Sequence, residues 1–146
     1  MNIEQAAAVN PSVDAEMHIQ QYLASDGSDV DHPAGDSLIL LYTTGRKSGE
    51  IKRVPLGSFP EGDALLVIGS NAGRSQLPAW YLNLVASPTV WVRKQAQFYE
   101  AEASVLPSEE RQVFWDNLIA QMPMFAEFQE TAGRELPVIR LTRVDT

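Results

Sequence analysis

The sequence lacks cysteine altogether and contains only two histidines, His18 and His32. Without cysteine there is no disulfide, no thiolate metal ligand and no thiol nucleophile, and we expect a reducing compartment, the cytoplasm. One histidine lies in a predicted helix and the other in an acidic loop, so we expect no metal site. No apolar run approaches the roughly twenty residues that cross a bilayer, and the first residues lack the basic flank of a signal peptide. We therefore expect no transmembrane segment.

Positive charge is also scarce. Eleven basic residues stand against nineteen acidic ones, which gives a formal net charge of -8, and such a surface repels polyanions. We therefore expect no nucleic-acid partner. The exception is local, because Arg46, Lys47, Lys52 and Arg53 fall within eight consecutive positions.

The length and composition indicate one ordinary hydrophobic core, since 45% of the 146 residues are hydrophobic. We expect a single domain over residues 1–146, with residues 1–12 and 143–146 flexible. Apolar runs and turn residues predict helices at residues 12–24, 78–86, 107–122 and 123–131. Strands are expected at residues 37–44, 51–59, 64–70, 90–92, 98–105 and 136–141.

Short turns join the first three predicted strands, which should therefore form an antiparallel meander. Pro55 places the second of these strands at a sheet edge or at a bulge. Six strands with helices at the start, in the middle and near the end predict an α+β domain built on a small barrel.

Most enzyme templates need residues that this chain does not supply. Gly45-Arg46-Lys47-Ser48 lacks the earlier glycine and the following helix of a P-loop. No Gly-x-Gly-x-x-Gly precedes a helix, and the strands do not alternate with helices as in a Rossmann sheet, which disfavours a nicotinamide dehydrogenase. No Gly-x-Ser-x-Gly elbow accompanies the two histidines, which disfavours a serine hydrolase.

Two clusters remain as candidates for a binding site. A turn bracketed by glycines offers backbone N–H groups, a hydroxyl and basic side chains that could converge on a phosphate. A solvated surface turn is the alternative, and composition alone favours it. The second cluster puts two aromatic side chains and an amide within one helical turn, although a tryptophan there could simply anchor the helix on the sheet. The residues concerned are Arg46, Lys47, Ser48 and Lys52 in the first cluster, and Pro78 to Asn83 in the second.

Several motifs have a joint order and spacing that is more specific than any one of them. They are Thr43-Thr44-Gly45-Arg46-Lys47-Ser48-Gly49, Pro55-Leu56, Ser70 with Gly73, Pro78 with Trp80-Tyr81-Leu82-Asn83-Leu84, Glu109-Glu110-Arg111 and Arg134-Glu135-Leu136-Pro137-Val138. On these motifs the chain resembles the deazaflavin-dependent nitroreductase family of actinobacteria, the F420H2-dependent reductases. The resemblance covers most of the chain, roughly from His18 to Leu141.

The resemblance implies a split β-barrel that binds coenzyme F420, a deazaflavin carrier of hydride. It implies that the coenzyme phosphate lies by Arg46, Lys47, Ser48 and Lys52. It implies that the ring system lies against Val54, Pro55, Leu56, Gly57, Ile68, Gly69, Ser70 and Asn71, and that the other side is closed by Ala79, Trp80, Tyr81 and Asn83. The cofactor then supplies the chemistry, while the protein positions it against the substrate and excludes water.

The chain also departs from the family pattern. Asn71-Ala72-Gly73 replaces a more usual Lys-Gly-Gly, which removes a positive charge beside the expected cofactor edge. Met122, Phe125 and Phe128 stand where the nitroimidazole-reducing type has tyrosines, so we expect a more apolar substrate pocket without hydroxyls that orient a nitro group. Simple core packing is an equally good interpretation of these three residues.

Our leading hypothesis is an F420H2-dependent reductase that transfers a hydride to an activated C=C bond of an apolar enone or lactone, or to a nitro group. Ser70 would orient the substrate, and Tyr81 or water would complete the reaction. Two alternatives stay open: an FMN-binding split-barrel oxidoreductase, and a non-catalytic carrier of a cofactor or another ligand. We expect a small-molecule partner and either a monomer or a weak homodimer.

Overall fold

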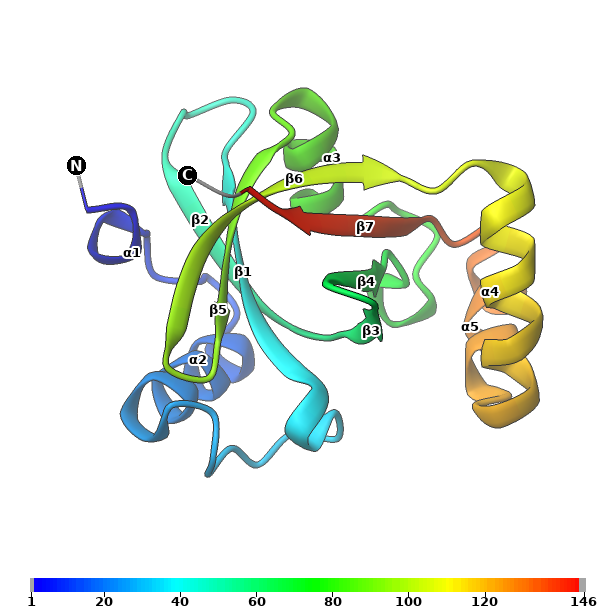
Figure 1. Cartoon of the computed structure of the whole chain (residues 1–146), viewed down its shortest axis with the longest axis horizontal. Coiled ribbons are helices and arrows are strands. Elements are labelled where there is room, and N and C mark those ends of the chain that lie inside the picture. Colours follow the sequence, from blue (N-terminus) through cyan, green and yellow to red (C-terminus); the bar gives the residue numbers. More distant parts are fainter. Residues whose placement is uncertain (1, 145–146) are drawn as a thin grey trace.

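The computed structural model describes residues 2–144 and contains five α-helices and seven strands among them (Figure 1). The helices are α1 (Ile3–Ala6), α2 (Val13–Ser25), α3 (Ala79–Ala86), α4 (Ser108–Gln121) and α5 (Met124–Ala132). The strands are β1 (Leu38–Thr44), β2 (Ile51–Gly57), β3 (Phe59–Glu61), β4 (Ala64–Ile68), β5 (Thr89–Lys94), β6 (Gln97–Val105) and β7 (Val138–Arg143). Every helix and strand expected from the sequence is present, and α1 and β3 are additional.

The seven strands form one antiparallel sheet in the order β2-β1-β5-β6-β7-β4-β3. Strands β2 and β3 are the two ends of this order, yet only Ser58 separates them in the chain, so the sheet curls back on itself. Ser58 makes this corner by donating its N–H and its hydroxyl to the carbonyl of Ser37. The α+β split-barrel architecture implied by the resemblance is confirmed.

The expected meander of the first three strands is wrong. The strand at residues 64–68 pairs with β7 and β3 and not with β2. The strand expected at residues 51–59 ends at Gly57, and only its last expected residue, Phe59, belongs to another strand, β3. Apolar alternation and turn residues specify a strand, but they do not specify its partner, because any strand with one apolar face can complete the same core. Pro55 does lie in an edge strand, as expected.

The inner face of the curled sheet carries the main core. Alternate residues of β1, β4, β5, β6 and β7 point inward, and Leu84 of α3 packs against them. Val54 and Leu56 of β2 and Tyr81 of α3 pack against this cluster but are only half-buried. Tyr99 of β6 is also half-buried, so the inner face is least filled along β2 and α3 and at this one position of β6.

The outer face is covered at two places, which lie at opposite ends of the molecule in Figure 1. Ile19 and Tyr22 of α2 pack on Leu38, Leu40 and Tyr42 of β1. At the other end, α4 and α5 cover the outer side of β4 and β7. Strand β1 is buried on both faces, as its continuous apolar run predicted.

The N-terminal segment lies along the free edge of β2. The N–H of Ala8 donates to the carbonyl of Ile51 over 2.8 Å, and the side-chain amide of Asn10 donates to the carbonyl of Arg53 over 2.8 Å. Two residues of the segment 1–12, which was expected to be flexible, are thus hydrogen-bonded to the sheet. Of the other residues expected to be flexible, 1, 145 and 146 lie outside the described residues. None of the helices described is both long and apolar enough to cross a membrane.

Candidate functional site

The turn between β1 and β2, which we call the basic hairpin (residues 45–52), is closed by its own backbone. Gly45 donates to the carbonyl of Glu50 over 2.7 Å, and Gly49 donates to the carbonyl of Gly45 over 2.9 Å. Gly49 has a φ of 73°, where a residue without a Cβ is favoured. A Cβ on Gly45 would lie 2.7 Å from the hydroxyl of Ser48 and 3.2 Å from the carbonyl oxygen of Glu50, so a larger residue there would displace the Ser48 side chain.

Asn83 of α3 holds the basic hairpin in place. It is buried, and its Oδ1 accepts hydrogen bonds from the backbone N–H of Arg46 (3.1 Å) and from Nη1 of the same residue (3.2 Å). Its Nδ2 donates to the hydroxyl of Thr43 over 3.2 Å. The amide is thus used within the protein, and Asn83 orients the hairpin.

The basic side chains of the hairpin face solvent. Arg46, Lys47 and Ser48 are exposed, and none of the ion pairs in the described chain involves Arg46 or Lys47. Nζ of Lys52 lies 3.4 Å from a carboxylate oxygen of Glu50, and both side chains are largely exposed. Such an exposed pair is weak, so Lys52 stays available to a stronger anion.

The two faces of β2 have different surroundings. Val54 and Leu56 belong to the inner face, and strand alternation puts Lys52 on the same side. Arg53 points outward and binds Glu16 of α2 over 3.0 Å. Pro55 and Gly57 also point outward, where a Cβ on Gly57 would lie 3.3 Å from the Cβ of Ala34. Only alternate members of the expected Val54–Gly57 wall therefore present side chains to the interior.

Helix α3 closes one side of this region. Trp80 is buried to 9% exposure in the inner core, as expected for an anchor of the helix on the sheet. Ala79 is exposed, and Tyr81 is half-buried with a hydroxyl that makes no hydrogen bond to the described residues. Of the expected aromatic pair, Tyr81 is thus the member with an accessible polar group.

The loop between β4 and α3, residues 69–76, carries the next group of expected site residues. Ser70 and Asn71 are half-buried, and the Ser70 hydroxyl bonds to none of the described residues. Gly69 is wedged between two prolines, since a Cβ there would lie 2.8 Å from Cγ of Pro137. Ile68 instead packs outward against the cluster under α4 and α5. Its side chain is therefore separated from the inner face.

Arg134 is the residue that sequence reasoning missed in this region. Its guanidinium donates hydrogen bonds to backbone carbonyls of the 69–76 loop. The only sequence signal was its place in the Arg134-Glu135-Leu136-Pro137-Val138 motif. That motif gave no indication of which distant segment the side chain would reach.

Met122, Phe125 and Phe128 lie in the outer cluster between α4, α5 and the sheet. Phe125 makes edge contacts with Phe59 (6.2 Å between ring centroids) and Phe128 (5.8 Å). A Cβ on Gly73 would lie 3.4 Å from the ring of Phe128, so Phe128 adjoins the 69–76 loop. All three are half-buried.

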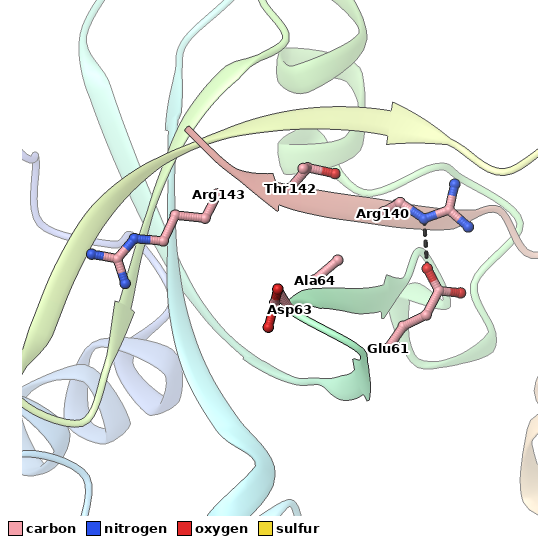
Figure 2. Close-up of a pocket in the computed structure, with 6 residues that line it drawn as sticks. All are labelled: Glu61, Asp63, Ala64, Arg140, Thr142 and Arg143. Carbon is pink, nitrogen blue, oxygen red and sulfur yellow. Dashed lines mark hydrogen bonds and ion pairs between the residues drawn. The ribbon is translucent and has the colours of Figure 1, made fainter. Parts of the chain in front are cut away.

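Two surface cavities lie away from this constellation. One, of about 610 Å³, is lined by charged and small residues of β3, β4, β7 and the turn between β3 and β4, and Figure 2 shows the pairing of Arg140 with Glu61 in it. The other, of about 350 Å³, lies between α4 and β3.

His18 and His32 pack edge to face outside the barrel, with their ring centroids 4.8 Å apart. Within residues 2–144, no three side chains of His, Asp or Glu gather as metal ligands would.

The structure therefore brings one group of expected residues together. The exposed cations of the basic hairpin continue directly into the half-buried inner face of β2, and α3 contacts both strands of that hairpin. Cations beside a partly open apolar surface suit a ligand that has an anionic end and a flat apolar end.

Comparisons with known proteins show which proteins the chain is similar to. An F420H(2)-dependent quinone reductase of Mycobacterium tuberculosis is 28% identical over 114 residues, which are 76% of each chain. A solved structure described as an F420-H2 dependent reductase is 33% identical, with a TM-score of 0.64, over 72% of this chain and 93% of that chain. Another, described as a domain-swapped dimer, is 31% identical, with a TM-score of 0.66, over 84% of this chain and 90% of that one.

The model of one protein family matches residues 15–143, which is nearly the whole chain. Its description is F420H(2)-dependent quinone reductase. The chain therefore belongs to the F420H(2)-dependent quinone reductase family, whose members are oxidoreductases with coenzyme F420 as cofactor.

Proposed function

We propose that the protein reduces a quinone or a related cyclic enone, with the reacting rings stacked on the inner face of β2. One observation carries the proposal. A turn with exposed cations, of which Lys52 has only an exposed partner in Glu50, runs directly into a half-exposed apolar strand face, and Asn83 of α3 holds the turn at Arg46 and Thr43. This is the surface that an anionic, flat-ringed hydride donor requires.

The residues fit coenzyme F420 as follows. Arg46, Lys47 and Lys52, with the Ser48 hydroxyl, hold the phosphate by charge-assisted hydrogen bonds. These cations stand in a chain of formal net charge -8, so the attraction is confined to the hairpin.

When bound, the deazaflavin ring would lie against Val54, Leu56 and Tyr81, which are half-buried and mainly apolar. The other residues expected around the ring act less directly. The backbone around the ring is shaped by Pro55, Gly57, Ile68 and Gly69. At the edge of the ring lie Asn71, in the 69–76 loop, and Ala79. Behind Ala79, the helix is supported from the protein interior by Trp80 and Asn83.

The substrate class follows from the family and from the apolar surroundings. A quinone is a cyclic conjugated dione, and it takes up one hydride and one proton to become a hydroquinone. Reduced F420 supplies the hydride. The free hydroxyls of Ser70 and Tyr81 orient the substrate oxygen, and Tyr81 or a water molecule delivers the proton.

The apolar side of the substrate lies toward Phe128, which adjoins the 69–76 loop. Met122 and Phe125 support that side through the outer cluster. Neither they nor Phe128 carry a hydroxyl, so nitro compounds should be poorer acceptors than quinones.

Binding of the cofactor tests the first half of the proposal. The purified protein is titrated with F420 and with FMN, and the quenching of tryptophan fluorescence is measured. We expect F420 to bind more tightly than FMN, and Lys47→Ala to weaken F420 binding about 10-fold through loss of a charge-assisted contact. Lys94→Ala, an exposed lysine at the far end of β5, is the control and should change the affinity less than about 2-fold. Tighter binding of FMN contradicts the proposal.

Turnover tests the second half. F420H2 is mixed with the protein and with menadione, cyclohexenone or a nitroarene, and its oxidation is followed by absorbance. We expect menadione to be reduced fastest and the nitroarene slowest. A protein that binds F420 but oxidises F420H2 with none of the three acceptors would be a carrier, and the catalytic proposal would then be wrong.

A further inference from the structure

Arg134 gathers the carbonyl groups of a distant loop around one guanidinium. It follows Gly133, whose φ of 65° turns the chain out of α5 and toward β7. Its Nη1 donates to Gly69 O at 3.1 Å, and its Nε donates to Ser75 O at 3.1 Å. Nη2 shares its two hydrogens among three carbonyls, those of Ser70 (3.4 Å), Arg74 (3.1 Å) and Gln76 (3.1 Å).

These contacts determine the direction of the neighbouring N–H groups. In a planar trans peptide the N–H points opposite to the carbonyl of the preceding residue, and the described chain contains no cis peptide. Because the carbonyls of Gly69 and Ser70 turn toward Arg134, the N–H groups of Ser70 and Asn71 turn away from it. Neither N–H donates a hydrogen bond to any residue between 2 and 144.

The two N–H groups also converge on one side. Ser70 has right-handed helical angles (φ -78°, ψ -31°), while Asn71 has a φ of 46° in the left-handed region. A right-handed residue followed by a left-handed one makes successive N–H groups face a common concavity that accepts an anion or a carbonyl oxygen. The Ser70 hydroxyl, which has no partner among the described residues, belongs to the same segment.

The conformation of the 69–76 loop needs stabilising contacts from outside the loop. Ala72 has a φ of 55°, which is unfavourable for a residue with a Cβ. The bonds within the loop are few: Gly73 N–H to Ser70 O, Arg74 N–H to Asn71 O, and the Asn71 side chain to Gln76 O. Backbone strain of this kind persists where the surroundings impose it, and Arg134 contributes more bonds to the loop than the loop makes with itself.

We propose that Arg134 is a positioning residue that holds the 69–76 loop so that the N–H groups of Ser70 and Asn71 bind an oxygen of a conjugated ring. The inference rests on the proposed function, and the acceptor is a carbonyl or oxyanion of the deazaflavin ring or of the quinone. Arg134 itself touches neither ligand. Its planar guanidinium can donate to several surrounding carbonyls at once, in fixed directions, which a lysine ammonium cannot do in the same way.

Amide NMR of the 15N-labelled protein tests the donor pair. Oxidised F420 and menadione are added in separate titrations, and the signals of Ser70 and Asn71 are followed. The ligand that moves both signals identifies the source of the oxygen. If both ligands bind, as shown by other signals, and neither moves the Ser70 or Asn71 amide, the proposal is overturned.

Three variants test Arg134. Arg134→Ala should weaken binding of that ligand about 10-fold or more, the loss expected for one or two hydrogen bonds. Arg134→Lys keeps the positive charge but lacks the planar guanidinium, and it should weaken binding of the same ligand about 3-fold or more. Arg140→Ala is the matched control, because Arg140 also binds several groups but on the outer surface, with Glu61 and Glu110. It should lower the melting temperature while leaving the affinity within about 2-fold.

Hydrogen exchange without ligand separates this proposal from the proposed function. In the wild type, the N–H groups of Gly73 and Arg74 should be protected, because they donate within the loop. In Arg134→Lys or Arg134→Ala they should exchange at least about 10-fold faster, while the sheet stays protected. Unchanged exchange together with wild-type affinity in both variants overturns the role of Arg134. Failure of the wild type to bind F420 refutes the proposed function. The exchange rates in the loop would still show whether Arg134 holds the 69–76 loop in its conformation.

Discussion

The two faces of β2 form the most instructive comparison in the molecule. Lys52 and Arg53 are adjacent, and both belong to the basic segment of the sequence. The side chain of Arg53 is 10% exposed and bound to Glu16, whereas that of Lys52 is 45% exposed and only loosely paired. The difference in exposure and pairing follows from strand alternation alone, because successive side chains point to opposite faces.

The comparison shows that a cluster of charges in a sequence is not one cluster in space. The outward half of this one fastens α2 and the N-terminal segment to the sheet, through Glu16, Asn10 and Arg53. The inward half is available to a ligand. Substitutions on the two faces should therefore change different properties of the protein, stability in one case and affinity in the other.

The largest expected effect is on the outward face. Arg53→Ala leaves the Glu16 carboxylate without its cation in a nearly buried position, and we expect a loss of about 2–3 kcal/mol in the free energy of unfolding. The melting temperature should fall by about 5–10 °C. F420 affinity, measured well below the melting temperature, should change less than about 2-fold. A stable Arg53→Ala protein with weak F420 binding would reverse the assignment of the two faces.

The next effect is on the inward face. Lys52→Ala should weaken F420 binding about 10-fold, since a charge-assisted hydrogen bond contributes about 1.5 kcal/mol or more. The melting temperature should stay within about 1–2 °C of the wild type, because the exposed pair with Glu50 is weak. Isothermal titration and thermal unfolding of the same sample measure both quantities. A stability loss as large as that of Arg53→Ala would contradict the comparison.

A smaller effect depends on pH. Burial by itself would raise the pKa of Glu16, but hydrogen bonds from the Asn10 N–H, Gln20 and Arg53, together with the charge of Arg53, lower it below its usual value of 4.5. The stabilisation is therefore complete above pH 4.5 and disappears as the pH falls through the lowered pKa of the folded state. Glu16→Gln should destabilise the protein at pH 7 and much less at pH 3, as measured by urea unfolding. An equal effect at both pH values would exclude an ionic role.

The smallest effect concerns Glu50, whose carboxylate pairs with Lys52. Glu50→Gln removes a carboxylate that competes with the phosphate for Nζ of Lys52. Because an exposed pair contributes at most about 1 kcal/mol, we expect F420 affinity to rise about 2- to 3-fold at low salt. The gain should shrink as salt screens the charges. No gain at any salt concentration would indicate that Lys52 lies outside the phosphate site.

Much of the fold was predictable because local chemistry specifies it. The run Ser37–Thr44 gave β1, and the glycines at 45 and 49 gave the hairpin. The sheet order was not predictable, since β4 could have paired with β2 by pattern alone. The break at Ser58 depends on the carbonyl of Ser37, twenty-one residues away, and no local pattern indicates it.

The candidate site was predictable to a similar degree. The motifs indicated segments that the fold brings together, but they did not distinguish side chains on the inner face from those that support the backbone. Alternation along β2 could have separated Val54 and Leu56 from Pro55 and Gly57. The internal use of Asn83 and the long reach of Arg134 depend on tertiary structure, and so does the packing of Phe125 against Phe59.

The cover of β2 by Ala8 and Asn10 has a practical consequence for protein preparation. The family match begins at residue 15, so a fragment cut at that point would lose both residues and leave the carbonyls of Ile51 and Arg53 open. An uncovered edge strand readily pairs with a strand of another molecule. Aggregates or adventitious dimers of such a truncated fragment would then reflect the choice of cloning boundary.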